Sequence, residues 1–136
     1  MSDSSPFDKA LALHQEDRMQ EAVDAYRTIL TAEPENEAVM LNLGQALRRL
    51  GRTEESAVLY RQATDQPTSA AGACYNLGNL SASRQNLEKA IAAFRKAIEL
   101  QPEMSPAHFQ LACCLRDTGN TNVAIKAFQT ANSLDS

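Results

Sequence analysis

The chain has 136 residues, of which 43% are hydrophobic and 22% charged, and its formal net charge at pH 7 is −4. This length suits one domain with an ordinary core, no apolar run is long enough to span a bilayer, and the weakly acidic charge argues against a nucleic-acid partner. Residues 1–6 lack the basic and apolar regions of a secretion signal, so we expect a cytoplasmic protein without membrane insertion.

The chain begins with the first of four predicted helix pairs. Ser5 and Pro6 place a capping hydroxyl before a proline, which favours a helix that runs to about residue 16. A turn at residues 17–18 and a second helix over about residues 19–32, with apolar residues spaced by three and four, complete the pair.

The second predicted pair starts near Glu37. Its first helix carries a broad apolar stripe that reaches Leu50, and Gly51 is expected to end it through its tolerance of positive φ. Thr53 is expected to cap the next helix, which should continue until Pro67.

The third pair is expected over residues 71–104, and the fourth opens with Ser105 and Pro106, which repeat the Ser5 and Pro6 start signal. The apolar stripes of these pairs extend to Leu100, Val123 and Leu134. Helices of roughly a dozen residues are marginal in isolation, so each pair must pack against the next one.

The four pairs repeat with one period. The Asn-Leu-Gly sequence at residues 42–44 recurs at residues 76–78, an offset of 34 (78 − 44). The offset aligns two columns of small residues and one of large residues: Ala10, Gly44, Gly78 and Ala112; Ala22, Ser56, Ala90 and Ala124; and Tyr26, Tyr60, Phe94 and Phe128. A glycine inside a helix costs about 1 kcal/mol relative to alanine, so we expect the partner helix to pass close to Gly44 and Gly78.

This pattern resembles the tetratricopeptide repeat family, which has Leu-Gly in the first helix, a small-aromatic-small series in the second, and then proline. The third repeat matches throughout, at Leu77, Gly78, Ala90, Phe94, Ala97 and Pro102. The first repeat departs most, with Lys9 and Ala10 in place of Leu-Gly. The resemblance implies an all-α fold, a right-handed α-solenoid of eight antiparallel helices in one domain, residues 1–136, with repeats at about 3–36, 37–70, 71–104 and 105–136.

The resemblance also implies a non-catalytic protein–protein interaction scaffold, in which the first helices of the pairs line a concave groove for a peptide segment of a partner protein. The candidate groove residues are Phe7, Leu41, Asn42, Gln45, Arg48, Arg49, Tyr75, Asn76, Asn79, Phe109, Gln110 and Arg116. Side-chain amides offer both a donor and an acceptor to a peptide backbone. The column of Asn42 and Asn76 is similar to the asparagine ladder of the repeat arm in O-linked N-acetylglucosamine transferases, and only these two residues match that ladder.

Each kind of groove residue has a structural alternative. The aromatic residues would instead pack against neighbouring helices, the amides would bond between helices or face solvent, and the arginines would form an ordinary solvated face. The clamp that chaperone-binding relatives use for a C-terminal carboxylate is not reproduced, because Leu41, Gln45 and Gln110 stand at its positions.

The sequence offers no catalytic or metal site. No Ser/His/Asp or Cys/His spacing and no glycine-rich phosphate loop is present, so neither an enzyme nor a cofactor is expected. Cys74 and His108 share a column of neighbouring repeats, yet two ligands do not make a zinc site. The adjacent Cys113 and Cys114 point in different directions on a helix, and we expect all three cysteines to be reduced thiols.

Two other functions stay open besides peptide binding. One is a substrate-recruiting or regulatory arm of a larger enzyme, such as a bacterial transferase. The other is a self-assembling module, because the last helix carries an apolar edge at Ile125, Phe128 and Leu134 that favours a homo-oligomer by end-to-end stacking.

Overall fold

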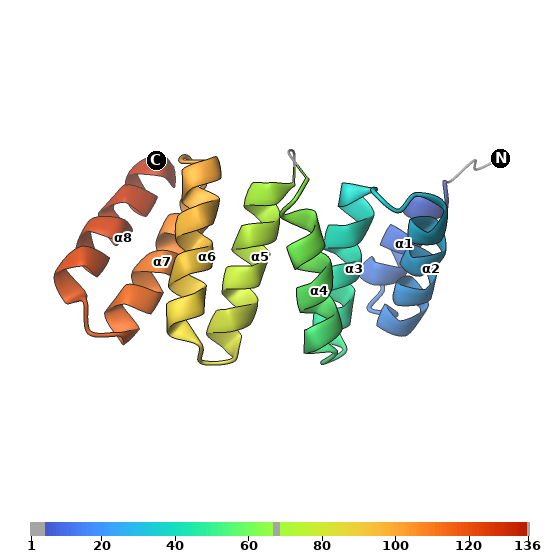
Figure 1. The fold of residues 1–136 in the computed structure, drawn as a ribbon, viewed down its shortest axis with the longest axis horizontal. Helices are drawn as coiled ribbons and strands as arrows, with labels where there is room; N and C mark the ends of the chain where they lie inside the picture. The colour runs from blue at the N-terminus through green and yellow to red at the C-terminus, as the bar shows by residue number, and fades with distance from the viewer. Residues whose placement is uncertain (1–4, 67–68, 136) are drawn as a thin grey trace. The chain divides into compact units, whose positions relative to one another are not determined.

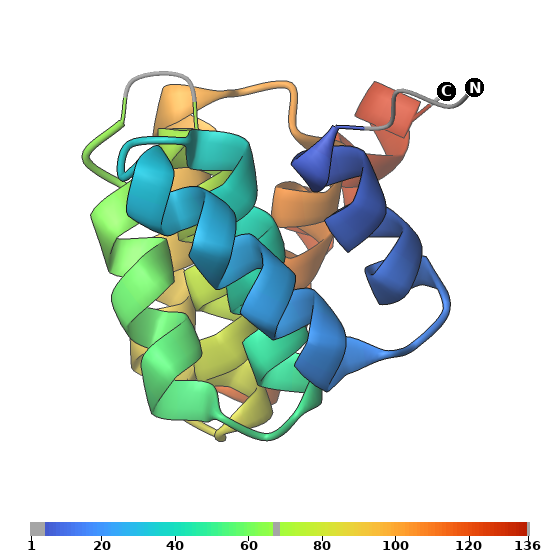
Figure 2. The same cartoon turned by 90° about the vertical axis from the view of Figure 1, so that its right-hand side faces the viewer.

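The computed structural model describes residues 5–66 and 69–135, and all regular structure within them is helical. Figure 1 shows the helices as antiparallel pairs joined by short turns. Figure 2 gives a second view, in which the turn between the first and second helices is visible. The helices of the described residues are α1 (Pro6–Gln15), α2 (Met19–Ala32), α3 (Glu37–Arg49), α4 (Thr53–Ala63), α5 (Ala70–Ser83), α6 (Leu87–Leu100), α7 (Ser105–Asp117) and α8 (Thr121–Asp135). The predicted all-α fold of paired helices is confirmed.

Contacts between helices divide the chain into two compact units, Met1–Ser69 and Ala70–Ser136, which we call the N-terminal and C-terminal units. In the N-terminal unit α1 packs on α2, α2 on α3 and α3 on α4. In the C-terminal unit α5 packs on α6, α6 on α7 and α7 on α8, and α5 also touches α7. Each unit therefore contains two stacked helix pairs, and the single domain expected from the length stays a prediction.

The turn inside each pair contains one residue with positive φ. These residues are Asp17 (63°), Gly51 (80°), Gln85 (62°) and Gly119 (88°), each 34 positions after the one before. The backbone N–H of the next residue then donates to a carbonyl five residues back, as Arg52 does to Leu47 over 2.8 Å. This bond satisfies a carbonyl at the end of the helix. Gly51 ends α3 as predicted.

Gly44 and Gly78 mark the closest approach between the two helices of a pair. A Cβ atom at Gly44 would lie 2.5 Å from Cε1 of Tyr60, and one at Gly78 would lie 2.5 Å from Cε1 of Phe94. Both rings are buried, at 1% and 0% exposure. The buried Ser56 hydroxyl donates to the Gly44 carbonyl over 2.7 Å. The close approach predicted from the glycines is therefore confirmed.

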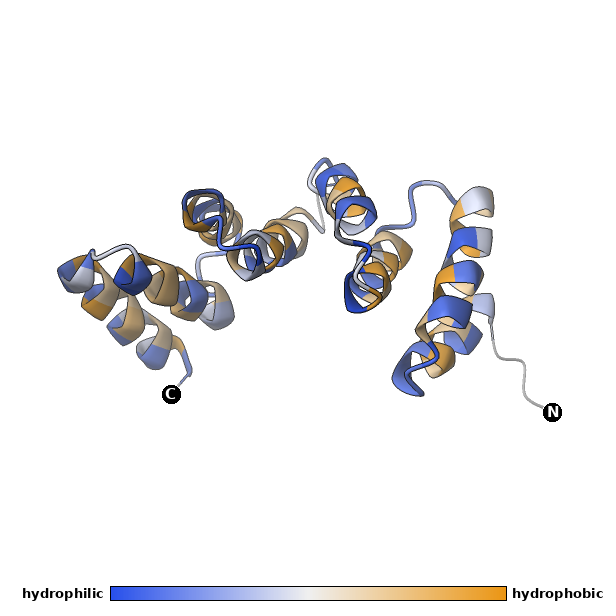
Figure 3. Ribbon diagram, turned by 90° about the horizontal axis from the view of Figure 1, so that it is seen from below, coloured by the Kyte–Doolittle hydropathy of each residue, from blue (hydrophilic) through white to orange (hydrophobic). Residues whose placement is uncertain are grey.

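Apolar and polar residues follow one another along the helices, and Figure 3 shows them as orange and blue segments around the ribbons. Four residues of the predicted stripes are nevertheless exposed: Leu50 at 38%, Leu100 at 46%, Val123 at 50% and Leu134 at 39%. Each lies in the first or last turn of its helix or just beyond it. The apolar stripe therefore extends in the sequence beyond the part of each helix that packs against a neighbour.

The two Ser-Pro signals start their helices differently. Ser5 accepts a hydrogen bond from the Asp8 backbone N–H at 3.1 Å, and Asp8 accepts one from the Ser5 N–H at 3.3 Å, so the predicted cap is confirmed. Ser105 is instead the first residue of α7, and its hydroxyl donates to the Ala131 carbonyl at 3.3 Å. The prediction that Ser105 repeats the cap is wrong, because His108 stands where Asp8 returns the bond and because α8 offers the hydroxyl a partner.

Thr53 does not cap α4 as predicted. It is the first helical residue, and its hydroxyl donates to the Gly51 carbonyl at 3.5 Å. The Arg52 carbonyl already accepts from the Ser56 N–H at 3.1 Å, so the helix begins one residue earlier than expected. Pro67, the predicted end of the second pair, lies outside the described residues.

Candidate functional site

The predicted groove residues lie on the first helices of the pairs, in two groups. The N-terminal unit holds Phe7 on α1 and Leu41, Asn42, Gln45, Arg48 and Arg49 on α3; the C-terminal unit holds Tyr75, Asn76 and Asn79 on α5 and Phe109, Gln110 and Arg116 on α7. None of them is buried, and Gln45, Phe109 and the three arginines are exposed. Because α5 touches α7, the residues of the C-terminal group come from two neighbouring helices.

The aromatic residues of the predicted groove each pack against an aromatic ring of the second helix in the same pair. The ring centroids are 6.3 Å apart for Phe7 and Tyr26, 5.8 Å for Tyr75 and Phe94, and 5.6 Å for Phe109 and Phe128. One part of each aromatic side chain therefore packs against a neighbouring helix, which is the structural alternative to ligand binding. The other part is open to solvent, most of all in Phe109, which is 50% exposed.

The amides differ in how far they are already bonded. Asn42 donates to the Ala38 carbonyl at 2.8 Å within its own helix, a contact that sequence reasoning did not expect. Within the described residues, the side chains of Asn76, Asn79 and Gln110 form no hydrogen bond. These three half-buried amides on α5 and α7 keep both donor and acceptor for another molecule.

A hollow of about 370 Å³ lies in the N-terminal unit between α1 and α3, and it is lined by His14, Gln45, Arg48 and Arg49. It brings three predicted groove residues together. His14 was not among the predicted site residues. A signal was present, because His14 stands 34 positions before Arg48, in the same column.

A partly buried hydrogen bond fixes the orientation of His14. Its Nδ1 lies 2.9 Å from the Tyr26 hydroxyl, and the Tyr26 ring is fully buried. Burial raises the pKa of Tyr26, so the hydroxyl keeps its proton and needs an acceptor. We infer that the hydroxyl donates to Nδ1 and that the other ring nitrogen, Nε2, carries the imidazole proton.

The pKa of His14 lies below its ordinary value of 6.5, chiefly through burial and secondly through the positive charge of Arg49, with Asp17 acting in the opposite direction. Because the pKa is lower in the folded chain, His14 takes up its proton at a higher pH in the unfolded chain than in the folded one. We therefore expect the free energy of unfolding to fall as the pH drops through 6.5, and by less in a His14→Gln variant. An NMR titration of the ring with a midpoint at or above 6.5 would contradict this.

The arginines of the predicted groove differ in their partners. Arg49 lies 4.0 Å from the Asp17 carboxylate, with both side chains more than half exposed, so this ion pair contributes little. Arg48 forms no ion pair with any described residue. Arg116 lies with its guanidinium 6.0 Å from the centroid of the Phe128 ring. Arg116 also lies 3.3 Å from the Asp117 carboxylate, so Arg48 is the arginine of this set that has no ion pair among the described residues.

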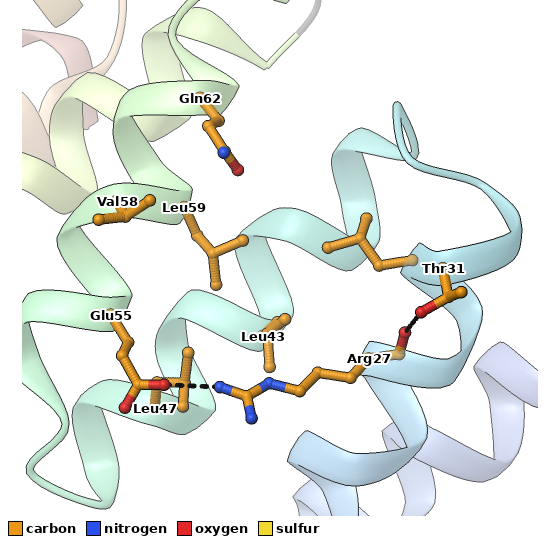
Figure 4. A pocket seen from close by; sticks show the side chains of 9 residues that line it. Arg27, Thr31, Leu43, Leu47, Glu55, Val58, Leu59 and Gln62 are labelled. Atoms are coloured by element: carbon orange, nitrogen blue, oxygen red, sulfur yellow. Dashed lines mark hydrogen bonds and ion pairs between the residues drawn. The ribbon is translucent and has the colours of Figure 1, made fainter.

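A second hollow, of about 560 Å³, lies among α2, α3 and α4 of the N-terminal unit and was not predicted (Figure 4). Leu43 and Leu47 contribute apolar surface, and Val58 is 48% exposed at its edge. Arg27 and Glu55 form an ion pair of 2.7 Å across the helices. The polar groups of that pair already bond to each other, which leaves mainly apolar surface for a ligand.

The C-terminal unit has a hollow of about 440 Å³ between α7 and α8, next to Phe109, Gln110 and Phe128. On the same final helix, Ile125 is 49% exposed and Leu134 39% exposed. The apolar edge predicted there is present. Self-assembly through this edge stays a prediction.

Chemically reactive groups are sparse in the described part of the chain. Its three cysteines are free, and burial raises the pKa values of Cys74 and Cys114, so these two thiols stay protonated. Among the residues that the structure covers, no three His, Cys, Asp or Glu side chains gather as metal ligands. His108 Nε2 lies 2.8 Å from the Pro102 carbonyl oxygen. None of the described helices has the length and apolar character that crossing a bilayer requires.

Comparison with known proteins agrees with the repeat pattern. A family model described as tetratricopeptide repeat matches residues 7–73, 41–107 and 75–133, in steps of 34 (41 − 7 and 75 − 41). No curated protein matches the sequence.

Solved structures share the fold. A MamA structure from Desulfovibrio magneticus is 22% identical to this chain, with a TM-score of 0.83. The match covers 96% of this chain and 73% of the MamA chain. A further MamA crystal structure is 24% identical over 96% and 71%, with a TM-score of 0.82. A structure from a functional characterization of Pseudomonas aeruginosa PilF is 21% identical over 94% and 59%, with a TM-score of 0.87. At these identities the likeness shows the fold alone.

Proposed function

We propose that this chain, which belongs to the tetratricopeptide repeat family, binds a peptide segment of a partner protein along the first helices of its repeats. The family supports a role in protein–protein interaction, and the observation that carries the finer proposal is the set of unbonded amides on α5 and α7. The proposed module is non-catalytic, and its proposed cytoplasmic location rests on the sequence.

The amides suit an extended peptide. Asn76, Asn79 and Gln110 are half-buried, so part of the cost of ordering their side chains has been met by folding. Each can donate to a peptide carbonyl and accept from a peptide N–H. Bonds to the backbone hold a segment whatever its side chains are, which gives affinity without strict sequence selection.

The aromatic residues beside the amides suit the side chains of the peptide. Tyr75 packs on Phe94 and Phe109 packs on Phe128, so both rings are held in place from behind. A ring fixed in this way loses little conformational entropy when a ligand covers its exposed part. The C-terminal unit therefore combines apolar contact surface with backbone-binding groups on neighbouring helices.

Replacing both Asn76 and Asn79 with alanine is expected to weaken peptide binding about tenfold or more, because two hydrogen bonds are lost at about 1 kcal/mol each. Peptides for the measurement are first selected on the wild-type chain from a random library with amidated C-termini, and their affinities are then determined by calorimetry. The free energy of unfolding should change by about 0.5 kcal/mol or less, because neither amide bonds within the fold.

Asn122→Ala is the matched control, since Asn122 is an exposed asparagine on α8, a second helix. It should leave both affinity and stability unchanged. Unchanged affinity in the Asn76 and Asn79 double variant, or a large loss of stability with intact binding, would contradict the proposed groove.

A further inference from the structure

The hollow between α1 and α3 is lined by hydrogen-bond donors. Arg48 and Arg49 contribute guanidinium groups, Gln45 contributes an amide, and His14 completes the lining. Its volume of about 370 Å³ falls within the range of roughly 300–1,000 Å³ that is typical of small-ligand pockets. None of the four lining side chains carries a negative charge.

The bond between His14 and Tyr26 makes His14 a donor toward the hollow. Its Nδ1 lies 2.9 Å from the Tyr26 hydroxyl, and in the tautomer inferred above the Nε2 N–H has no partner among the described residues. The ring also packs edge-on against Tyr26, with centroids 5.8 Å apart. The donor is therefore held in position by the fold before any ligand arrives.

The charge of the hollow is opposite to that of the unit around it. Residues 1–69 contain seven Lys and Arg against twelve Asp and Glu, a net charge of −5. Among the lining residues, Arg49 has an ion pair with a carboxylate, that of Asp17, at 4.0 Å. The net negative charge of the unit repels an acidic ligand, whereas Arg48 and Arg49 attract it at this hollow, which favours selective placement.

We propose that this hollow receives the side-chain carboxylate of an aspartate or glutamate of the partner peptide, an inference that rests on the proposed function. Arg48, with no ion pair inside the described chain, supplies a paired N–H fork that matches the two carboxylate oxygens. Arg49 adds a second positive charge, and Gln45 and His14 donate to the remaining lone pairs. The chain thereby selects peptides with an acid at one fixed position.

The test uses the full chain and a random peptide library with amidated C-termini, so that Asp and Glu side chains are the only carboxylates in the library. Peptides selected on the wild-type chain are expected to show Asp or Glu at one shared position. Changing that acid to Asn or Gln should weaken binding about tenfold, the effect of losing charge-assisted hydrogen bonds. The Arg48→Gln, Arg49→Gln double variant should bind both peptides equally.

Arg61→Gln is the matched control, because Arg61 is an exposed arginine of the same unit on α4, a second helix. It removes a positive charge outside the hollow and should retain the preference for the acid. The charge-reversed Arg48→Glu, Arg49→Glu variant should select Lys or Arg at the shared position. Circular dichroism of each variant confirms that the helices are retained.

The outcomes separate this inference from the proposed function. Peptides that bind through Asn76 and Asn79 but show no preferred acid would overturn the carboxylate site and leave the groove standing. A library that yields no binder would remove the groove itself. A phosphoserine at the shared position that binds much more tightly than Asp or Glu would reassign the hollow to phosphopeptides and overturn the proposal as stated.

Discussion

Replacing Phe94 with alanine is expected to lower the free energy of unfolding by about 3–5 kcal/mol. The ring is 0% exposed and lies against Gly78 of the first helix in its pair. It also belongs to the core cluster that joins α6 to α7 and α8, so its removal leaves a cavity that several helices line. The loss is a large part of the roughly 5–15 kcal/mol by which folded domains are usually stable.

Urea denaturation followed by circular dichroism measures this effect. Phe109→Ala is the matched control, since Phe109 is the same residue type in the same unit but is 50% exposed. Its replacement should cost about 1 kcal/mol, mostly through the lost edge-to-face contact with Phe128. Equal losses for the two variants would show that Phe94 does not hold the C-terminal unit together.

Replacing Gly78 with alanine is expected to have opposite effects in two backgrounds. In the wild-type chain the new Cβ atom would lie 2.5 Å from the Phe94 ring, which is buried and must shift. Overpacking of this kind costs about 1–3 kcal/mol, and the better helix propensity of alanine returns about 1 kcal/mol. The net result is a destabilisation of about 1 kcal/mol.

In the Phe94→Ala background the ring is absent and only the gain in propensity remains. Gly78→Ala should then stabilise the chain by about 1 kcal/mol, which gives a coupling energy of about 2 kcal/mol in a double-mutant cycle. Gly51→Ala, at a glycine with a φ of 80° and no atom within 4 Å of the added Cβ, provides a control for strain without a clash. The same change in both backgrounds for Gly78→Ala would refute the close-approach account.

The sequence was sufficient for the fold because the residues that set it repeat in fixed columns. Gly78 and Phe94 sit 16 positions apart (94 − 78), as do Gly44 and Tyr60 (60 − 44), and the structure brings each pair into contact. Small and large residues that recur at one offset describe a packing contact directly. The helix pairs could therefore be predicted without knowledge of any relative.

Local signals failed where a tertiary contact outweighed them. Ser5 and Ser105 each precede a proline, but Ser105 bonds to Ala131 of another helix, which a local motif cannot reveal.

Gln85 adopts a φ of 62° in a turn position where two other repeats have glycine. The hydrogen bond that closes the turn stabilises this conformation whatever the residue is.

The candidate site was predicted as a face but not as a set of interactions. The spacing of residues along the first helices placed Asn42 and Asn76 in one column, yet Asn42 turned out to bond to Ala38 of its own helix. His14 shares a column with Arg48, yet its role depends on Tyr26, 12 positions later, whose buried hydroxyl orients the ring. Such bonds depend on side-chain conformations, which the repeat pattern does not specify.

The most direct test of the proposed binding face is an NMR titration of the isotope-labelled full chain with a peptide selected from the random library. The first-helix face predicts that the largest shifts fall on α5 and α7, at the side-chain amides of Asn76, Asn79 and Gln110 and the ring of Phe109. Shifts that concentrate instead on Val58, Leu59 and Gln62, around the hollow of α2, α3 and α4 in Figure 4, would contradict the proposal.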